Sequence, residues 1–181
     1  MSALLSFARQ LQQQALSSNQ RRILRLQGEQ SWCYQQTKQL IEALQLDYFW
    51  CGHSPDGIDS ISYKQILGRE TSLLIINAYD SFDANAFAAS EGTLRGGGLL
   101  ILLTPTTIPA EDLFYHYVHA QLATCQVATI HEDRPVPGEK KKRLTAAKQA
   151  ALNHSEQQSA IADIIKTVTG HRRRPFAALP L

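Results

Sequence analysis

Two aspartates that follow an apolar run are the first residues of this chain that could do chemistry. Asp80 and Asp83 come three and six residues after Leu73–Asn77, a predicted strand. A carboxylate at the end of such a strand could bind a metal or act as a base. Asp83 could equally cap the alanine-rich segment after it as a helix, and Asp80 could shape the turn. Because no histidine or further carboxylate adjoins them in the sequence, the structural roles are favoured.

Histidine and cysteine side chains offer weaker candidates. His116 and His119 are three residues apart in a segment of helical pattern, so both rings can face one way, but a zinc site needs further ligands. Cys33 and Cys51 each follow a tryptophan and are expected to pack as small apolar side chains. With Cys125 they make an odd number, which argues against a disulfide framework and favours a reducing compartment. We therefore predict no metal site and no catalytic residue.

The glycines do not form a recognisable phosphate-binding loop. Gly28 stands alone after a predicted strand, where a dinucleotide-binding loop requires three spaced glycines. The triplet Gly96–Gly98 precedes an apolar run instead of following one, and no Lys-Ser or Lys-Thr pair comes after it. These three glycines are expected to end a helix and to turn tightly into Leu99.

The elements that must position these residues alternate between apolar runs and helical patterns. Such alternation predicts an α/β, doubly wound, flavodoxin/Rossmann-like fold, with a mainly parallel five-stranded sheet and helices on both faces. Strand order 2-1-3-4-5 is favoured, and it would open a crevice beside Gly28 and Asp80. The expected strands are 22–28, 47–51, 73–77, 99–103 and 126–131, and the expected helices are 2–18, 31–44, 62–67, 83–94 and 112–123.

Charge divides the 181-residue chain into unequal parts. Residues 1–137 hold nine Lys and Arg against thirteen Asp and Glu, a net charge of −4, whereas residues 138–181 hold nine against three, a net charge of +6. We expect an α/β domain over 1–134, a basic linker over 135–154 and a C-terminal helix–strand extension over 155–181. Such a basic segment is either a solvated linker or a contact for nucleic acid.

Targeting signals are missing from the printed sequence. No stretch of 18 apolar residues occurs, and glutamines interrupt the N-terminal apolar pattern where a secretory signal needs an unbroken core. These features predict a cytoplasmic protein without a membrane partner.

Several segments together resemble a known family. They are Arg22-Ile-Leu-Arg-Leu-Gln-Gly28 with Trp32-Cys33, Leu67-Gly68-Arg69-Glu70, Phe82-Asp-Ala-Asn-Ala-Phe-Ala-Ala89, Gly92-Thr-Leu94 and Leu99–Pro105. As a set they resemble the N-terminal domain of bacterial tRNA(Met) cytidine acetyltransferase over about residues 20–105, and the rest matches only in layout. That family is similar to a helicase-like ATPase fused to an acetyltransferase and a tRNA-binding tail. It uses acetyl-CoA and ATP with magnesium to form N4-acetylcytidine at the wobble position of elongator tRNA(Met).

The resemblance implies that this chain is a non-catalytic N-terminal module of an enzyme. Residues 155–181 would begin the ATPase domain and stop before its phosphate loop, so we expect the isolated chain to be inactive and to hold no cofactor. In the family a glutamine upstream of the first phosphate-binding strand contacts the nucleotide. By spacing this is Gln157, with Gln158 as the alternative. The implied partners are tRNA and the downstream ATPase and acetyltransferase domains of the same chain.

The basic segment supplies candidate contacts for tRNA phosphates, which bind Lys and Arg with little sequence preference. They are Lys140, Lys141, Lys142, Arg143, Arg172, Arg173 and Arg174. Two other functions stay open. One is a stand-alone flavodoxin-like module that binds a small phosphorylated ligand, which an amide-lined anion pocket beside Gly28 would favour. The other is a small enzyme using Asp80 or Asp83, which an ionisable partner for Asp80 would favour.

Overall fold

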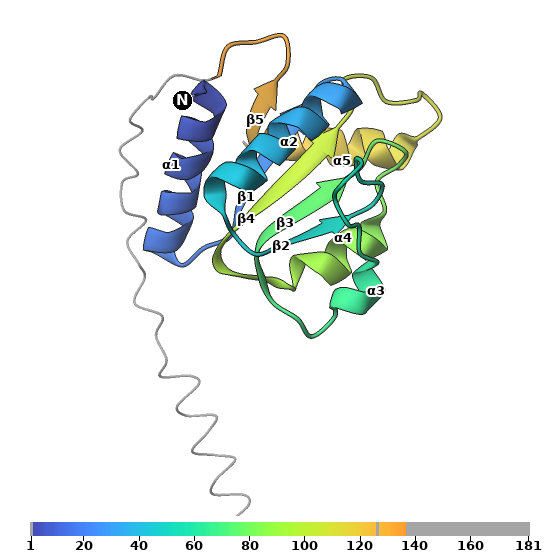
Figure 1. Ribbon diagram of the computed structural model, residues 1–181. Coiled ribbons are helices and arrows are strands. Elements are labelled where there is room, and N and C mark those ends of the chain that lie inside the picture. The colour runs from blue at the N-terminus through green and yellow to red at the C-terminus, as the bar shows by residue number, and fades with distance from the viewer. Residues whose placement is uncertain (1, 126, 137–181) are drawn as a thin grey trace, which may run out of the picture. The chain divides into compact units, whose positions relative to one another are not determined.

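The computed structural model describes residues 2–125 and 127–136, and these form one parallel sheet with helices on both faces (Figure 1). All strand pairs are parallel, in the order β2-β3-β4-β1-β5. The strands are β1 Arg22–Gln27, β2 Tyr48–Cys51, β3 Thr71–Asn77, β4 Leu94–Thr104 and β5 Ala128–His131. The helices are α1 Ala3–Ser18, α2 Gln30–Leu44, α3 Tyr63–Ile66, α4 Ala84–Glu91 and α5 Leu113–Thr124.

The predicted α/β doubly wound class is confirmed, but the predicted strand order 2-1-3-4-5 is wrong. β4 lies in the centre, between β3 and β1, because eight of its eleven residues form a continuous buried run from Gly97. β1 carries Arg25 and Gln27 among its apolar residues and lies one place from the edge. The two shortest strands, β2 and β5, form the edges.

Side-chain alternation along the strands builds two cores, one on each face of the sheet. Leu99, Ile101 and Leu103 of β4 face α1 and α2, where they pack with Leu24 of β1. Leu100 and Leu102 face the other way, toward α3, α4 and α5. Continuous apolar runs are typical of parallel strands buried on both faces, which is why these strands could be recognised from the sequence.

The glycine triplet does not end a helix, contrary to the prediction. α4 ends at Glu91, and Gly96–Gly98 lie inside β4. There the pairing with β3 shifts from Thr71–Leu94 to Leu73–Leu99, so β4 carries three extra residues in an irregular segment. Gly97 has a φ of +80° within it. Because Gly96 and Gly97 lack side chains, Leu16 of α1 and its C-cap residue Asn19 can approach β4 closely, which the sequence did not indicate.

Residues beyond 136 lie outside the described part of the chain. The predicted basic linker 135–154, apart from its first two residues, and the extension 155–181 therefore stay predictions. Among the helices of residues 2–125 and 127–136, none combines the length and the apolar character that crossing a membrane requires.

Candidate functional site

The carboxyl ends of the strands are the place where an open α/β sheet binds ligands, at the point where its connections diverge. Here that point lies between β1 and β4, because β1 leads into α2 on one face and β4 leads toward α5 on the other. β4 therefore separates β1 from β3, contrary to the predicted order. The loops after β1 and β3 still meet, since Tyr79 Oη donates a hydrogen bond of 2.7 Å to the Gly28 carbonyl.

A carboxylate of the chain itself occupies the start of α2. Glu132, just after β5, accepts a 2.7 Å hydrogen bond from the backbone N–H of Glu29, the N-cap residue of α2. A Cβ on Gly28 would lie only 2.7 Å from Glu132 Oε2 and 2.9 Å from Trp32 Cε3, so side chains fill the space beside this glycine. Helix N-termini attract anions, and Glu132 supplies the anion here. The helix expected from residue 31 begins one residue earlier, at Gln30, so Ser31 lies within α2.

Polar side chains at the ends of β2 and β3 are also satisfied internally. Asn77 Nδ2 donates to Tyr34 Oη at 2.7 Å and to the His53 carbonyl at 2.6 Å. The same carbonyl accepts from Trp50 Nε1 at 3.0 Å. These bonds fasten the loop after β2 to α2 and β3. Their groups hold the fold together and are not aimed at a ligand.

Asp83 has the structural role that was favoured. Its Oδ1 accepts hydrogen bonds of 2.9 Å from the backbone N–H groups of Asn85 and Ala86, which caps α4. It lines a pocket of about 230 Å³ with Cys51 and Tyr63, and Asp80 is not among the lining residues. Asp80 therefore does not share this pocket with Asp83, and the two aspartates do not form an acid–base pair there.

The cysteines of the described residues do not provide an activated nucleophile. Cys33 and Cys51 are buried, and burial raises the pKa of each thiol to about 11. A hydrogen bond with Tyr79 lowers the pKa of Cys33 less than burial raises it. Cys125 is exposed. The expected packing role of the two buried thiols is confirmed.

We predict that one thiol of the folded chain reacts rapidly with an aromatic disulfide reagent at pH 8, and that two react only on unfolding. A thiol with a pKa of about 11 is roughly 0.1% thiolate at that pH, and burial blocks access further. The measurement is thiol release against time, in native buffer and in denaturant. The control Cys125→Ser should lose the fast phase, and a second fast thiol would contradict the assignment.

The two histidines of α5 have different polar partners and do not point at a common metal position. His119 Nε2 lies 3.1 Å from Gln27 Nε2, whereas His116 Nε2 lies 3.1 Å from the Pro109 carbonyl. Burial, followed by the charge of Arg25, lowers the pKa of His119. Within residues 2–125 and 127–136, no three His, Cys, Asp or Glu side chains are grouped as a metal site would require.

A buried arginine is the polar residue that the sequence analysis missed. Arg25, on β1, is only 3% exposed and donates from Nε to Thr104 Oγ1 at 2.8 Å. Its Nη2 is buried and has no hydrogen-bond partner among the described residues. Gln27 shares its face of the sheet and is 6% exposed. The spacing of these two polar residues within an apolar strand was the available signal, since residues i and i+2 face one way.

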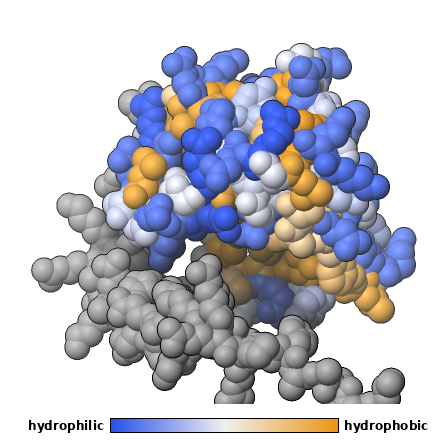
Figure 2. Space-filling view, turned by 90° about the horizontal axis from the view of Figure 1, so that it is seen from below, coloured by the Kyte–Doolittle hydropathy of each residue, from blue (hydrophilic) through white to orange (hydrophobic). Residues whose placement is uncertain are grey.

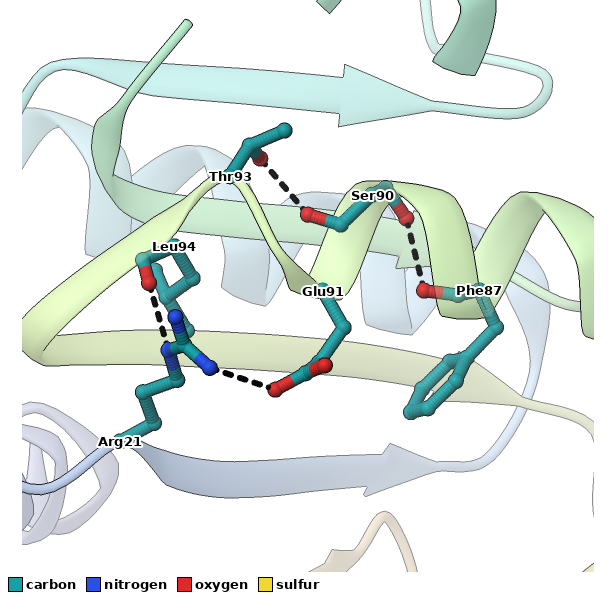
Figure 3. A network of polar contacts seen from close by, with 6 residues as sticks. All are labelled: Arg21, Phe87, Ser90, Glu91, Thr93 and Leu94. Carbon is teal, nitrogen blue, oxygen red and sulfur yellow. Dashed lines mark hydrogen bonds and ion pairs between the residues drawn. The ribbon is translucent and has the colours of Figure 1, made fainter. Parts of the chain in front are cut away.

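The segment around Gly92–Leu94, part of the family resemblance, contributes to structure (Figure 3). Arg21 donates from Nε to the Leu94 carbonyl at 2.6 Å and from Nη1 to Glu91 Oε1 at 2.9 Å. Thr93 Oγ1 donates to the Ser90 carbonyl at 2.7 Å, which closes the turn after α4. Together these bonds connect the start of β1 with the turn between α4 and β4.

Leu67–Glu70, another segment of the family resemblance, lies across a shallow depression from this turn. The depression, of about 340 Å³, lies at the amino ends of β3 and β4 and is lined by Leu67–Glu70 on one side and Gly92–Thr93 on the other. On the side of the molecule seen in Figure 2 polar residues predominate, with smaller apolar areas between them and a larger apolar area in the lower part of the coloured surface. Neither segment brings a nucleophile or an acid–base pair to the depression.

Every site residue predicted from the sequence lies outside the described residues. This holds for the nucleotide candidates Gln157 and Gln158, and for the RNA contacts Lys140, Lys141, Lys142, Arg143, Arg172, Arg173 and Arg174. Their assignments therefore stay predictions.

Comparison with known proteins identifies the family. The family model described as tRNA(Met) cytidine acetyltransferase TmcA, N-terminal, matches residues 1–131. A relative from Vibrio cholerae named tRNA(Met) cytidine acetyltransferase TmcA is 32% identical over 95% of this chain and 24% of its own length. Relatives of the same name from Pectobacterium atrosepticum and Nitrosococcus halophilus are 36% and 28% identical over 66% and 89% of this chain.

The chain spans about a quarter of the length of these curated relatives, between 18% and 26%. The family match covers the whole described sheet and all five of its helices. The chain therefore belongs to the family of tRNA(Met) cytidine acetyltransferase TmcA N-terminal domains.

Proposed function

We propose that this chain is the non-catalytic N-terminal module of an RNA acetyltransferase. The whole enzyme uses acetyl-CoA and ATP, with magnesium, to form N4-acetylcytidine at the wobble position of elongator tRNA(Met). The observation that carries the proposal is the family match over residues 1–131, in relatives about four times as long as this chain. The acetyl-CoA site and the phosphate loop belong to the remaining three quarters.

The arrangement at the carboxyl edge of the sheet supports a non-catalytic role. Two carboxylates that could act on a ligand there are used within the fold, Glu132 at the start of α2 and Asp83 at the start of α4. The buried thiols have pKa values raised to about 11. These residues serve the fold of a domain on which other domains of the enzyme assemble.

The main alternative is a stand-alone flavodoxin-like module that binds a small phosphorylated ligand beside Gly28. Glu132 argues against it, because its carboxylate already accepts the backbone N–H of Glu29 and fills the space that a phosphate would need. A phosphate there would have to displace Glu132 and overcome its negative charge.

A transplantation experiment tests the proposal. The chain replaces the corresponding N-terminal part of the Vibrio cholerae relative, and N4-acetylcytidine in tRNA(Met) is measured by nucleoside chromatography with mass spectrometry. We expect the chimera to acetylate tRNA, and the relative without its N-terminal part to do so at least tenfold more slowly, since tenfold corresponds to only about 1.4 kcal/mol in the barrier.

The isolated 181-residue chain is measured in parallel. It is expected to hydrolyse no ATP and to transfer no acetyl group above a control without protein. Robust turnover of either substrate by the chain alone would contradict the non-catalytic assignment, and an inactive chimera would contradict its role as this module.

A further inference from the structure

The charge of Arg25 has no counter-ion among the described residues. Arg25 is only 3% exposed, and its burial lowers the pKa of the guanidinium. None of the ion pairs formed within the described residues includes it. A buried charge is costly unless it is paired, so an unpaired arginine with an unsatisfied nitrogen points to a partner outside these residues.

The carboxylates that begin α5 and follow β5 are engaged elsewhere. Asp112 accepts the backbone N–H of Tyr115 at 2.9 Å and caps α5. Glu132 accepts the backbone N–H of Glu29, and Asp133 lies 3.9 Å from the guanidinium of Arg134. None of these groups forms an ion pair with Arg25.

Neutral and basic side chains surround the guanidinium on the α5 face of the sheet. Gln27 pairs in register with Thr104 of β4 and His131 of β5, so these three side chains form a row beside Arg25. His119 reaches the row from α5 through its 3.1 Å contact with Gln27. Both imidazoles are only partly buried, whereas Arg25, Gln27 and Thr104 are buried, so solvent reaches this group of side chains at its histidines.

The charges acting on the two imidazoles come from each element around them. Arg25, His116 and His131 lower the pKa of His119 together with burial, its first cause. Burial, Arg134 and Arg25 lower the pKa of His131, and Asp133 raises it. Positive charge therefore predominates around the row, and an anion placed there would reverse these shifts.

We propose that Arg25, Gln27, His119 and His131 form a binding site for a tetrahedral oxyanion of the phosphate type. The buried guanidinium supplies the fixed charge, the Gln27 amide supplies a neutral donor, and the imidazoles add charge when protonated. This site lies on the opposite face of the sheet from α2, whose N-terminus Glu132 occupies. It is separate from the family activity and does not depend on the proposed function.

A sulfate titration of the 181-residue chain tests the site, because sulfate keeps its charge between pH 6 and pH 8. The ring signals of His119 and His131 are followed by nuclear magnetic resonance. We expect sulfate to raise the pKa of both rings in a saturable way, and to bind more tightly at pH 6 than at pH 8. In Arg25→Met the two pKa values should rise without sulfate, and sulfate should bind at least tenfold more weakly.

Arg22→Met is the matched control, since Arg22 lies on the same strand but on the other face. Its Nε is also buried without a hydrogen-bond partner among the described residues, although the residue is less buried than Arg25. Sulfate also stabilises proteins in general by exclusion from their surface, so only the difference between variants counts. Equal ring titrations in the wild type and Arg25→Met would overturn the site. If Arg25→Met does not fold, the variant with both His119→Gln and His131→Gln replaces it. Calorimetry should then show about tenfold weaker sulfate binding at pH 6, and unchanged binding would also overturn the proposal.

Two further ligands identify the source of the phosphate group. Adenosine 5′-monophosphate presents a terminal phosphate, whereas a short single-stranded RNA with a 5′-hydroxyl presents only phosphodiesters. Competition with sulfate by the first alone assigns the site to a small phosphorylated molecule, and competition by the RNA assigns it to a nucleic-acid backbone. Competition by neither would overturn the phosphate assignment.

Discussion

Replacing Gly97 with valine is expected to lower the free energy of unfolding by about 3 kcal/mol, through backbone strain and a clash with α1. Gly97 is buried in β4 with a φ of +80°, which β-branched residues rarely adopt. A Cβ there would lie 3.0 Å from Leu16 Cδ2 and 3.3 Å from Leu16 Cα. The helix backbone would have to move, so α1 would lose packing on β4.

Gly57→Val is the matched control for this prediction. Gly57 has the same φ of +80°, but a Cβ there would meet no atom within 4 Å. It should therefore cost only the backbone strain of about 1–2 kcal/mol. Urea unfolding of both variants, followed by circular dichroism, measures the difference. If both variants lower the free energy of unfolding by the same amount, the result would contradict close packing of α1 on Gly97.

Neutralising the basic segment is expected to remove most of the affinity of the chain for tRNA. Seven contacts from Lys140–Arg143 and Arg172–Arg174 would give a slope of roughly −5 to −6 in a plot of log affinity against log salt. The wild-type affinity should then fall about a thousandfold between 50 and 200 mM salt. The variant with all seven changed to glutamine should bind weakly, with a much shallower slope.

Filter binding of labelled tRNA(Met) at several salt concentrations measures both affinity and slope. The control changes the exposed Arg69, Arg95 and Arg134 of the α/β domain to glutamine, and it should keep the wild-type slope. Equal binding by the wild type and the seven-residue variant would reject the basic segment as the RNA contact. Phosphate contacts carry little sequence information, so unrelated tRNAs should bind similarly.

Local periodicity was sufficient to predict most of the described elements, although β4 begins at Leu94 and not at the expected residue 99. The expected strand 73–77 corresponds to β3, Thr71–Asn77, and the expected helix 2–18 corresponds to α1, Ala3–Ser18. These predictions succeeded because apolar runs and helical spacing are properties of short segments. The capping role of Asp83 was likewise local, since a cap bonds to N–H groups only two and three residues ahead.

Strand order was not predictable in the same way. The doubly wound class permits several orders, and the order depends on which apolar surfaces fit together across the sheet. β4 lies at the centre and has a long buried run. β1 lies beside β5, where its polar Gln27 contacts His119 of α5 and pairs in register with His131. The triplet Gly96–Gly98 was misassigned for a related reason. The close packing that requires glycine here involves α1, which lies about 80 residues earlier in the chain.

The sequence by itself determined the fold class, the family and the absence of a recognisable phosphate loop from the printed chain, because each follows from local patterns and ordered motifs. Only the tertiary structure decided which charges are paired. Glu132 reaches Glu29 across a separation of 103 residues, and Arg25 lies buried beside His119 and His131 without a carboxylate partner. Burial and pairing are properties of side chains that meet in space, and chain positions alone do not carry them.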